Sequence, residues 1–134
     1  MENELSPQEQ EIYMQQLIEN YQNPKNFGNL EDYTYYSHQK NTTCGDSFDI
    51  YIKTNKEKKI EDIKFYGEGC AISTASFSLL TQKLKGIKIE DAKKFSKDEL
   101  KKMIGVKISP GRTNCAMLSY NALHDAINPE NNNN

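Results

Sequence analysis

An alternating pattern in the middle of the chain limits the fold more than any other feature of the sequence. Apolar and polar residues alternate over 48–53 and again over 62–66. Because residues two apart point to the same side of a strand, each run predicts a strand with one apolar face and one wet face. The polar turn at 54–59 predicts that the two strands form an antiparallel hairpin. We expect a further, aromatic-rich strand within residues 30–37.

Helices are predicted on both sides of these strands in the sequence. The first helix begins after Ser6, which forms a capping box with Glu9, and it ends before Pro24. The later helices are predicted at 70–85, 89–95, 96–104 and, after a break at 109–111, through residue 127. The order helix, strands, helices predicts an α+β fold with the helices packed on one face of the sheet.

The chain is predicted to form a single domain, residues 1–134, with an ordered core at about 8–128. A flexible tail is expected at 129–134, where the sequence is low in complexity. The acidic N-terminus lacks the regions of a secretory signal, and no window approaches the ~18 apolar residues of a membrane-spanning helix. We therefore expect a cytoplasmic protein that does not contact membranes. A net charge of −2 argues against general nucleic-acid binding, which normally requires a basic excess.

All three cysteines stand at predicted junctions between elements. Cys44 precedes the second strand, Cys70 opens a helix, and Cys115 lies in the first turn of the last helix. Free N–H groups and the helix dipole favour the thiolate at helix N-termini, and the thiolate is both the nucleophile and the metal ligand. Asp46 follows Cys44 by two positions, so in an extended segment the two side chains share a face. With Cys70 and Cys115 they are four potential ligands, an S₃O set that suits tetrahedral zinc or an iron–sulfur cluster. The alternative is that the three cysteines are separate structural residues.

A cation beside such a site would offset its negative charge. Three thiolates and a carboxylate carry about −4, and a bound Zn²⁺ or Fe²⁺ leaves about −2. Arg112, three positions before Cys115, is the candidate for this auxiliary role; the alternative is a solvated surface arginine. We expect neither His38 nor His124 to be a ligand, because His124 lies more than two helical turns beyond Cys115 and His38 stands in a polar segment.

Four sequence segments together resemble the U-type iron–sulfur cluster assembly scaffold family, with its IscU, SufU and NifU N-terminal branches. They are residues 21–28, 44–46, 67–73 and 115–118, which read YQNPKNFG, CGD, GEGCAIS and CAML. They follow the family's order over about 13–127, nearly the whole chain. The resemblance implies an IscU/SufE-like α+β fold with a three-stranded antiparallel sheet. It also implies a solvent-exposed site made of Cys44, Asp46, Cys70 and Cys115.

The resemblance further implies a function as a carrier, not as an enzyme in its own right. In this family a cysteine desulfurase delivers sulfur to the scaffold as a persulfide, and Fe²⁺ joins it. A labile [2Fe–2S] cluster is then built and passed to apo iron–sulfur client proteins. The persulfide acceptor is Cys115 by analogy with the scaffold branch and Cys44 by analogy with the SufU branch. Zn²⁺ is an alternative occupant, and Asp46 resembles the weak ligand that keeps the site labile.

Departures from the family pattern help to decide between the scaffold branch and the SufU branch. Asn114 stands where the scaffold branch has a histidine, which favours the alternative of a zinc-dependent, SufU-like sulfurtransferase that activates a cysteine desulfurase. The 45-residue spacing from Cys70 to Cys115 argues for the scaffold branch, because SufU carries an insertion there. The segment 108–112, ISPGR, keeps only the proline and the terminal cation of the family's Leu-Pro-Pro-Val-Lys motif, which argues against docking of its dedicated heat-shock chaperone.

Overall fold

Three antiparallel strands form the one sheet of the described chain, in the order β1-β2-β3. The computed structural model describes residues 5–128, so the tail expected at 129–134 lies outside the described residues. The strands are β1 (Tyr35–Asn41), β2 (Asp46–Thr54) and β3 (Ile60–Glu68). In the central strand Ile50 pairs with Ser37 of β1 and with Phe65 of β3, which fixes the register on both sides.

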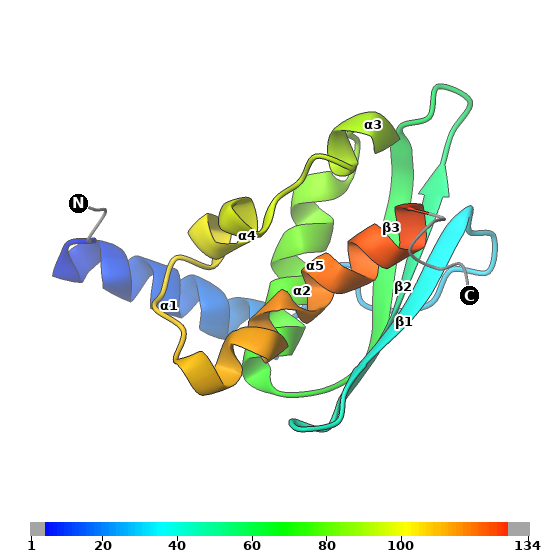
Figure 1. The fold of residues 1–134 in the computed structure, drawn as a ribbon. Coiled ribbons are helices and arrows are strands. Elements are labelled where there is room, and N and C mark those ends of the chain that lie inside the picture. The colour runs from blue at the N-terminus through cyan, green and yellow to red at the C-terminus, as the bar shows by residue number, and fades with distance from the viewer. Residues whose placement is uncertain (1–4, 129–134) are drawn as a thin grey trace.

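The helices cover one face of this sheet, as Figure 1 shows. They are α1 (Pro7–Gln22), α2 (Ala71–Leu84), α3 (Ile89–Ala92), α4 (Lys97–Ile104), the 3₁₀ turn η1 (Pro110–Arg112) and α5 (Thr113–Ile127). Helices α2 and α5 pack on the strands, and α1 packs against α2. The expected α+β architecture is therefore confirmed. None of the helices in the described part of the chain is long and apolar enough to cross a membrane.

The predicted alternation builds the core of the molecule. Phe48, Ile50 and Ile52 are fully buried on the helix side of β2, and Ile63 and Phe65 of β3 lie beside them. Burying apolar area of this kind is the main favourable contribution to folding. The opposite face of the sheet stays open to solvent, as expected for an antiparallel sheet covered on one side.

Two buried serines join the main helices. Ser76 of α2 donates a hydrogen bond to the Ala116 carbonyl over 2.8 Å, and its hydroxyl lies 2.8 Å from that of Ser119 in α5. Ser37 of β1 likewise donates to the Ala122 carbonyl over 2.7 Å. Hydrogen bonds made inside a core are costly to lose, so α5 is fixed to both α2 and β1.

Some sequence predictions differ from the structure in detail. The first strand was expected within 30–37 but begins at Tyr35 and runs through Asn41, because its polar residues pair along β2 as far as Asp46. The helix expected at 89–95 is only Ile89–Ala92, since the chain turns there to bury Phe95 and to place Ser96 as the cap of α4.

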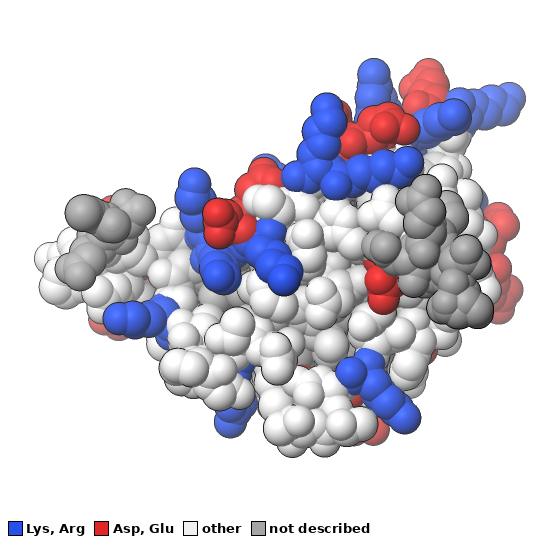
Figure 2. Space-filling model, viewed as in Figure 1, with Lys and Arg blue, Asp and Glu red and all other residues white. Residues whose placement is uncertain are grey.

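The surface around α3 is strongly charged but mixed in sign. In the space-filling view Lys and Arg side chains gather there together with Asp and Glu side chains (Figure 2). Lys93 and Glu90 form one exposed pair, with 3.8 Å between the charged atoms. Pairs of this kind contribute little to stability, and they indicate a solvated helical surface.

Candidate functional site

A tight turn between β1 and β2 carries Cys44. The backbone N–H groups of Cys44 and Gly45 both donate to the Asn41 carbonyl, over 3.2 and 2.8 Å. Gly45 has φ of +75°, a left-handed conformation that glycine adopts without strain. The Asn41 side chain also accepts the N–H of Thr43 over 3.2 Å. This turn holds the half-buried Cys44 at the end of the sheet.

Asp46 begins β2 and is buried, with 1% of its surface exposed. Its Oδ1 accepts the backbone N–H of Cys70 over 2.8 Å. Its Oδ2 is the one buried side-chain polar atom without a hydrogen-bond partner in the described part of the chain. A buried carboxylate oxygen left unpaired is costly, and a bound cation would satisfy it.

Cys115 approaches from the first turn of α5 and is fully buried. Its Sγ lies 2.6 Å from the Sγ of Cys44, and the Asn41 amide donates to it over 3.7 Å. Burial raises the pKa of the Cys115 thiol, and the neighbouring Cys44, Cys70 and Asp46 raise it further. Without a cation this thiol therefore stays protonated in neutral solution.

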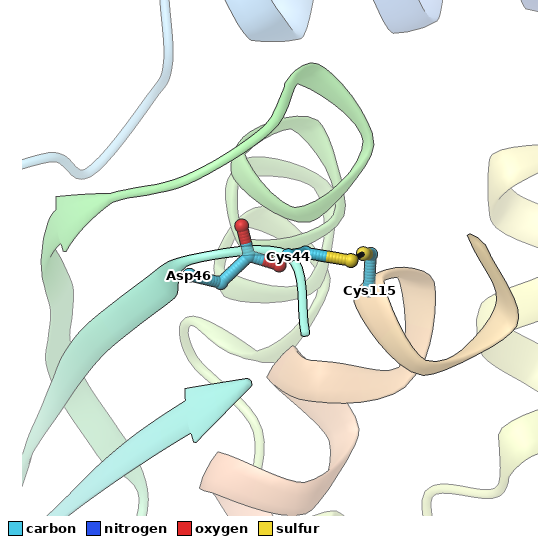
Figure 3. Close-up of side chains that lie close together, drawn as sticks. All are labelled: Cys44, Asp46 and Cys115. Carbon is cyan, nitrogen blue, oxygen red and sulfur yellow. Dashed lines mark hydrogen bonds between the residues drawn. The ribbon is translucent and has the colours of Figure 1, made fainter. Parts of the chain in front are cut away.

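Three side chains thus converge on one point. The ligand atoms of Cys44, Asp46 and Cys115 all lie within 4.8 Å of one another. Figure 3 shows the two sulfur atoms facing each other from the β1–β2 turn and from α5, with Asp46 beside them on β2. Two sulfurs and one oxygen are a donor set that suits zinc or iron.

The structure leaves the sulfur of Cys70 at the margin of this group. Cys70 is the N-cap of α2, and its Sγ lies 3.6 Å from the Ser73 hydroxyl. Partial burial opposes ionisation, but hydrogen bonds from the Ser73 N–H and hydroxyl outweigh it and lower the pKa of Cys70. Of the four predicted ligands, three are together, and the fourth is joined to them through its backbone bond to Asp46.

The other residues singled out in the sequence have surroundings of their own. Arg112 is exposed and lines a groove of about 410 Å³ between α1 and the segment before η1. His38 contacts Asp49 on the open face of the sheet, with 2.8 Å between Nδ1 and Oδ1. His124 contacts the Phe95 carbonyl over 2.9 Å through Nε2.

Sequence reasoning missed three residues that shape the site. Asn41 holds the Cys44 turn and contacts Cys115, and Ser73 contacts Cys70. At Gly69 a Cβ atom would collide with the Asp46 carboxylate and would come within 2.8 Å of the Phe48 ring. The glycine beside Cys70 was a visible signal of close packing, whereas the contacts of Asn41 depend on tertiary structure alone.

Comparison with known proteins places this arrangement in a family. The model of the NifU-like N terminal domain matches residues 12–132. Iron-sulfur cluster assembly scaffold protein IscU 1 of Archaeoglobus fulgidus is 37% identical over 116 residues, which is 87% of this chain and 74% of that protein. Zinc-dependent sulfurtransferase SufU of Bacillus subtilis is 35% identical over 136 residues, covering 89% of this chain and 91% of that protein.

A solved structure supports the same assignment at the level of the fold. The crystal structure of the N-terminal part of a nitrogen-fixing NifU-like protein from Brucella abortus superimposes with a TM-score of 0.71. The match covers 92% of this chain and 96% of that one, at 18% sequence identity. With the family model spanning nearly the whole chain, this protein belongs to the NifU-like N-terminal domain family of iron–sulfur cluster assembly scaffolds.

Proposed function

We propose that this protein is an iron–sulfur cluster assembly scaffold. It accepts sulfur from a cysteine desulfurase as a persulfide, takes up Fe²⁺, and assembles a labile [2Fe–2S] cluster as its cargo. The ligands are Cys44, Asp46 and Cys115, with Cys70 as the fourth. The finished cluster passes to apo iron–sulfur proteins, so the chain works as a carrier and not as an enzyme.

The unpaired oxygen of Asp46 is the observation that carries this proposal. Oδ2 is buried beside two sulfur atoms, and a bound iron ion would satisfy it while separating sulfurs that are only 2.6 Å apart. The other oxygen is already committed to the Cys70 N–H. A carboxylate is the hardest of the four ligands and binds soft metal–sulfur clusters least well, so its release gives the cluster a route out.

Cys70 completes the ligand set in this proposal through a small rotation of its side chain. Its backbone is already fixed to Asp46, and its sulfur lies 3.6 Å from the Ser73 hydroxyl, a weak bond to exchange for a metal. The Cys70 thiol is also one of the groups that raise the pKa of Cys115, so the two thiols interact with each other.

A zinc-dependent sulfurtransferase is the second candidate. It is favoured by Asn114, an exposed amide where a histidine ligand would stand, and by the similarity to the Bacillus SufU. Cys44, Asp46 and Cys115 would hold Zn²⁺, which supplies the positive charge that keeps these thiols ionised. The chain would then activate the desulfurase by taking its sulfur, without building a cluster.

Anaerobic reconstitution separates the two candidates. Protein incubated with cysteine desulfurase, L-cysteine and Fe²⁺ is expected to develop the visible absorption of a [2Fe–2S] cluster and to transfer it to an apo-ferredoxin. The Cys44→Ser variant should not hold this cluster, whereas Ser109→Ala, an exposed position in the nearby loop, should behave as wild type. Persulfide formation and desulfurase activation by wild type without any cluster would instead establish the sulfurtransferase.

A further inference from the structure

We propose that Asn41 is a positioning residue that tunes the bond between Cys115 and a bound metal. Its side-chain amide donates a hydrogen bond to the Cys115 sulfur, and this bond draws electron density away from the thiolate. The inference rests on the proposed function in taking Cys115 as a ligand. It applies equally to iron, zinc and a cluster, because it concerns the sulfur and not the occupant.

Strand β1 brings Asn41 to the first turn of α5. Ser37 donates to the Ala122 carbonyl over 2.7 Å, and Asn41, four positions further along the strand, meets Cys115 near the start of the same helix. Positions an even number apart on a strand share a face, so both side chains point to α5. The Asn41 Nδ2 is thereby held 3.7 Å from the Cys115 sulfur, and bonds to sulfur are longer than bonds to oxygen because sulfur is the larger atom.

The orientation of the Asn41 amide follows from its other contact. Its Oδ1 accepts the backbone N–H of Thr43 over 3.2 Å, and because a backbone N–H can only donate, the atom that faces it is the oxygen. The NH₂ group is therefore the one turned to Cys115. The Asn41 carbonyl also accepts the N–H groups of Cys44 and Gly45. One residue thus shapes the turn that carries Cys44 and donates to the sulfur opposite.

The three cysteine sulfurs differ in the groups that donate to them. Cys115 has the Asn41 amide, and Cys70 has the Ser73 hydroxyl at 3.6 Å. Within residues 5–128 the one donor to the Cys44 sulfur is the Cys115 thiol, whose proton is lost when both sulfurs hold a metal. Cys44 would then be the most electron-rich thiolate, whereas Cys115 keeps a donor that lowers its electron density.

This donor has a consequence for the cluster that we propose as cargo. Hydrogen bonds to the sulfurs are among the factors that set the reduction potential of iron–sulfur clusters. A ligand that gives less charge to iron favours the reduced form, so Asn41 raises the potential of a cluster held by Cys115. Because the amide is neutral, it has this effect without changing the charge of the site.

The test uses Co²⁺, because a thiolate bound to Co²⁺ gives a sulfur-to-cobalt charge-transfer band in the near ultraviolet. The intensity of this band per cobalt follows the number of thiolates, and its position follows the energy of the sulfur electrons. The metal-free full chain is titrated anaerobically with Co²⁺ alone to saturation. Asn41→Ser keeps a hydroxyl that can accept the Thr43 N–H but is too short to reach Cys115. We expect its band at longer wavelength than in wild type and at unchanged intensity.

Two further variants complete the experiment. Asn55→Ser is the matched control, because Asn55 shapes the other hairpin turn in the same way, with its Oδ1 accepting the N–H groups of Glu57 and Lys59 over 2.9 and 3.1 Å. Its band should coincide with that of wild type. Asn41→Asp keeps the acceptor and the size of the side chain but replaces the donor by an oxygen, so its band should also move to longer wavelength. Circular dichroism checks that each variant is folded.

The outcomes separate this inference from the function beneath it. A band at the wild-type position in both Asn41 variants would overturn the tuning role and leave Cys115 as a ligand. A weaker band in these variants would mean that a thiolate has left the metal, and Asn41 would then only hold the turn. If wild type gives no sulfur-to-cobalt band, the cysteine ligands of the proposed function are wrong, and this inference is wrong with them.

Discussion

The backbone N–H of Cys70 is hydrogen-bonded to Oδ1 of Asp46 over 2.8 Å, so one carboxylate joins the start of α2 to the start of β2. One oxygen of this side chain therefore supports the fold, and the other is buried and unpaired. A single residue thus supports the fold and, in the proposed function, also offers a ligand to the metal.

Replacing Asp46 with alanine is expected to lengthen the life of a bound cluster. The substitution removes the hardest ligand and with it the route by which the cluster leaves, so decay in the presence of a chelator should slow by roughly threefold or more. Asp49→Ala is the matched control, because Asp49 lies three positions along the same strand on the open face. Faster loss of visible absorbance in Asp46→Ala than in wild type would contradict this expectation.

Removal of metal is expected to weaken the fold without unfolding it. The core around Phe48, Phe65 and Phe77 is packed independently of the site. Zn²⁺ at about 100 times its Kd adds about 2.7 kcal/mol to the free energy of unfolding, which corresponds to roughly 10 °C in Tm. Thermal melts by circular dichroism with and without chelator measure this shift. An unfolded metal-free protein would identify a structural zinc domain instead.

Gly69→Ala is expected to damage the site and the fold together. The added methyl group meets the Asp46 carboxylate and the Phe48 ring, which costs about 1–3 kcal/mol of stability and about 10–100-fold in zinc affinity. Gly111→Ala serves as the control because a Cβ at Gly111 has nothing within 4 Å. Chemical denaturation and zinc titration report the two effects, and equal zinc affinity in both variants would show that the Asp46 carboxylate tolerates displacement.

Ser73→Ala is expected to raise the pKa of Cys70. The hydroxyl of Ser73 is one of the groups that hold this pKa below its ordinary value, so less thiolate is present at a given pH in the variant. Alkylation of Cys70 in the metal-free protein should therefore begin at higher pH and run more slowly near neutrality. Thr74→Ala, the next position of the same helix turn, is the control. Peptide mass spectrometry after timed iodoacetamide treatment distinguishes Cys70 from the other thiols.

Cys115 should show the opposite behaviour in the same experiment. Burial raises its pKa, so it stays protonated and unreactive until the pH rises well beyond the ordinary thiol range of about 8.5. The order of alkylation is expected to be Cys70 before Cys115 at every pH. Early modification of Cys115 would mean that the first turn of α5 opens in solution.

Local sequence patterns predicted the central strands and the helix starts well. The alternation through Ile50 and Phe65 needs no tertiary information, and the capping box predicted at Ser6 forms. The first strand was misplaced because its second half, through Asn41, has no apolar alternation and is fixed by pairing with β2.

The site was predictable in part. Local signals in the sequence predict Cys70 and Cys115 at helix starts. In the structure they lie at the starts of α2 and α5. That Cys44 meets Cys115 across 71 positions was implied only by the family resemblance. The unpaired oxygen of Asp46 and the contact of Asn41 with Cys115 arise from packing, which no local pattern records.

The buried bonds of Ser76 to Ala116 and Ser119 make the two sides of the site unequal in stiffness. Cys115 stands on a helix that cannot shift without breaking polar contacts in the core, whereas Cys44 stands on a turn held mainly by Asn41. A sulfur, an ion or a two-iron cluster would then be accommodated by movement of the turn that carries Cys44, while α5 stays in place. Evolution or design could retune the capacity of the site through residues 41–45 and leave the rest of the domain unchanged.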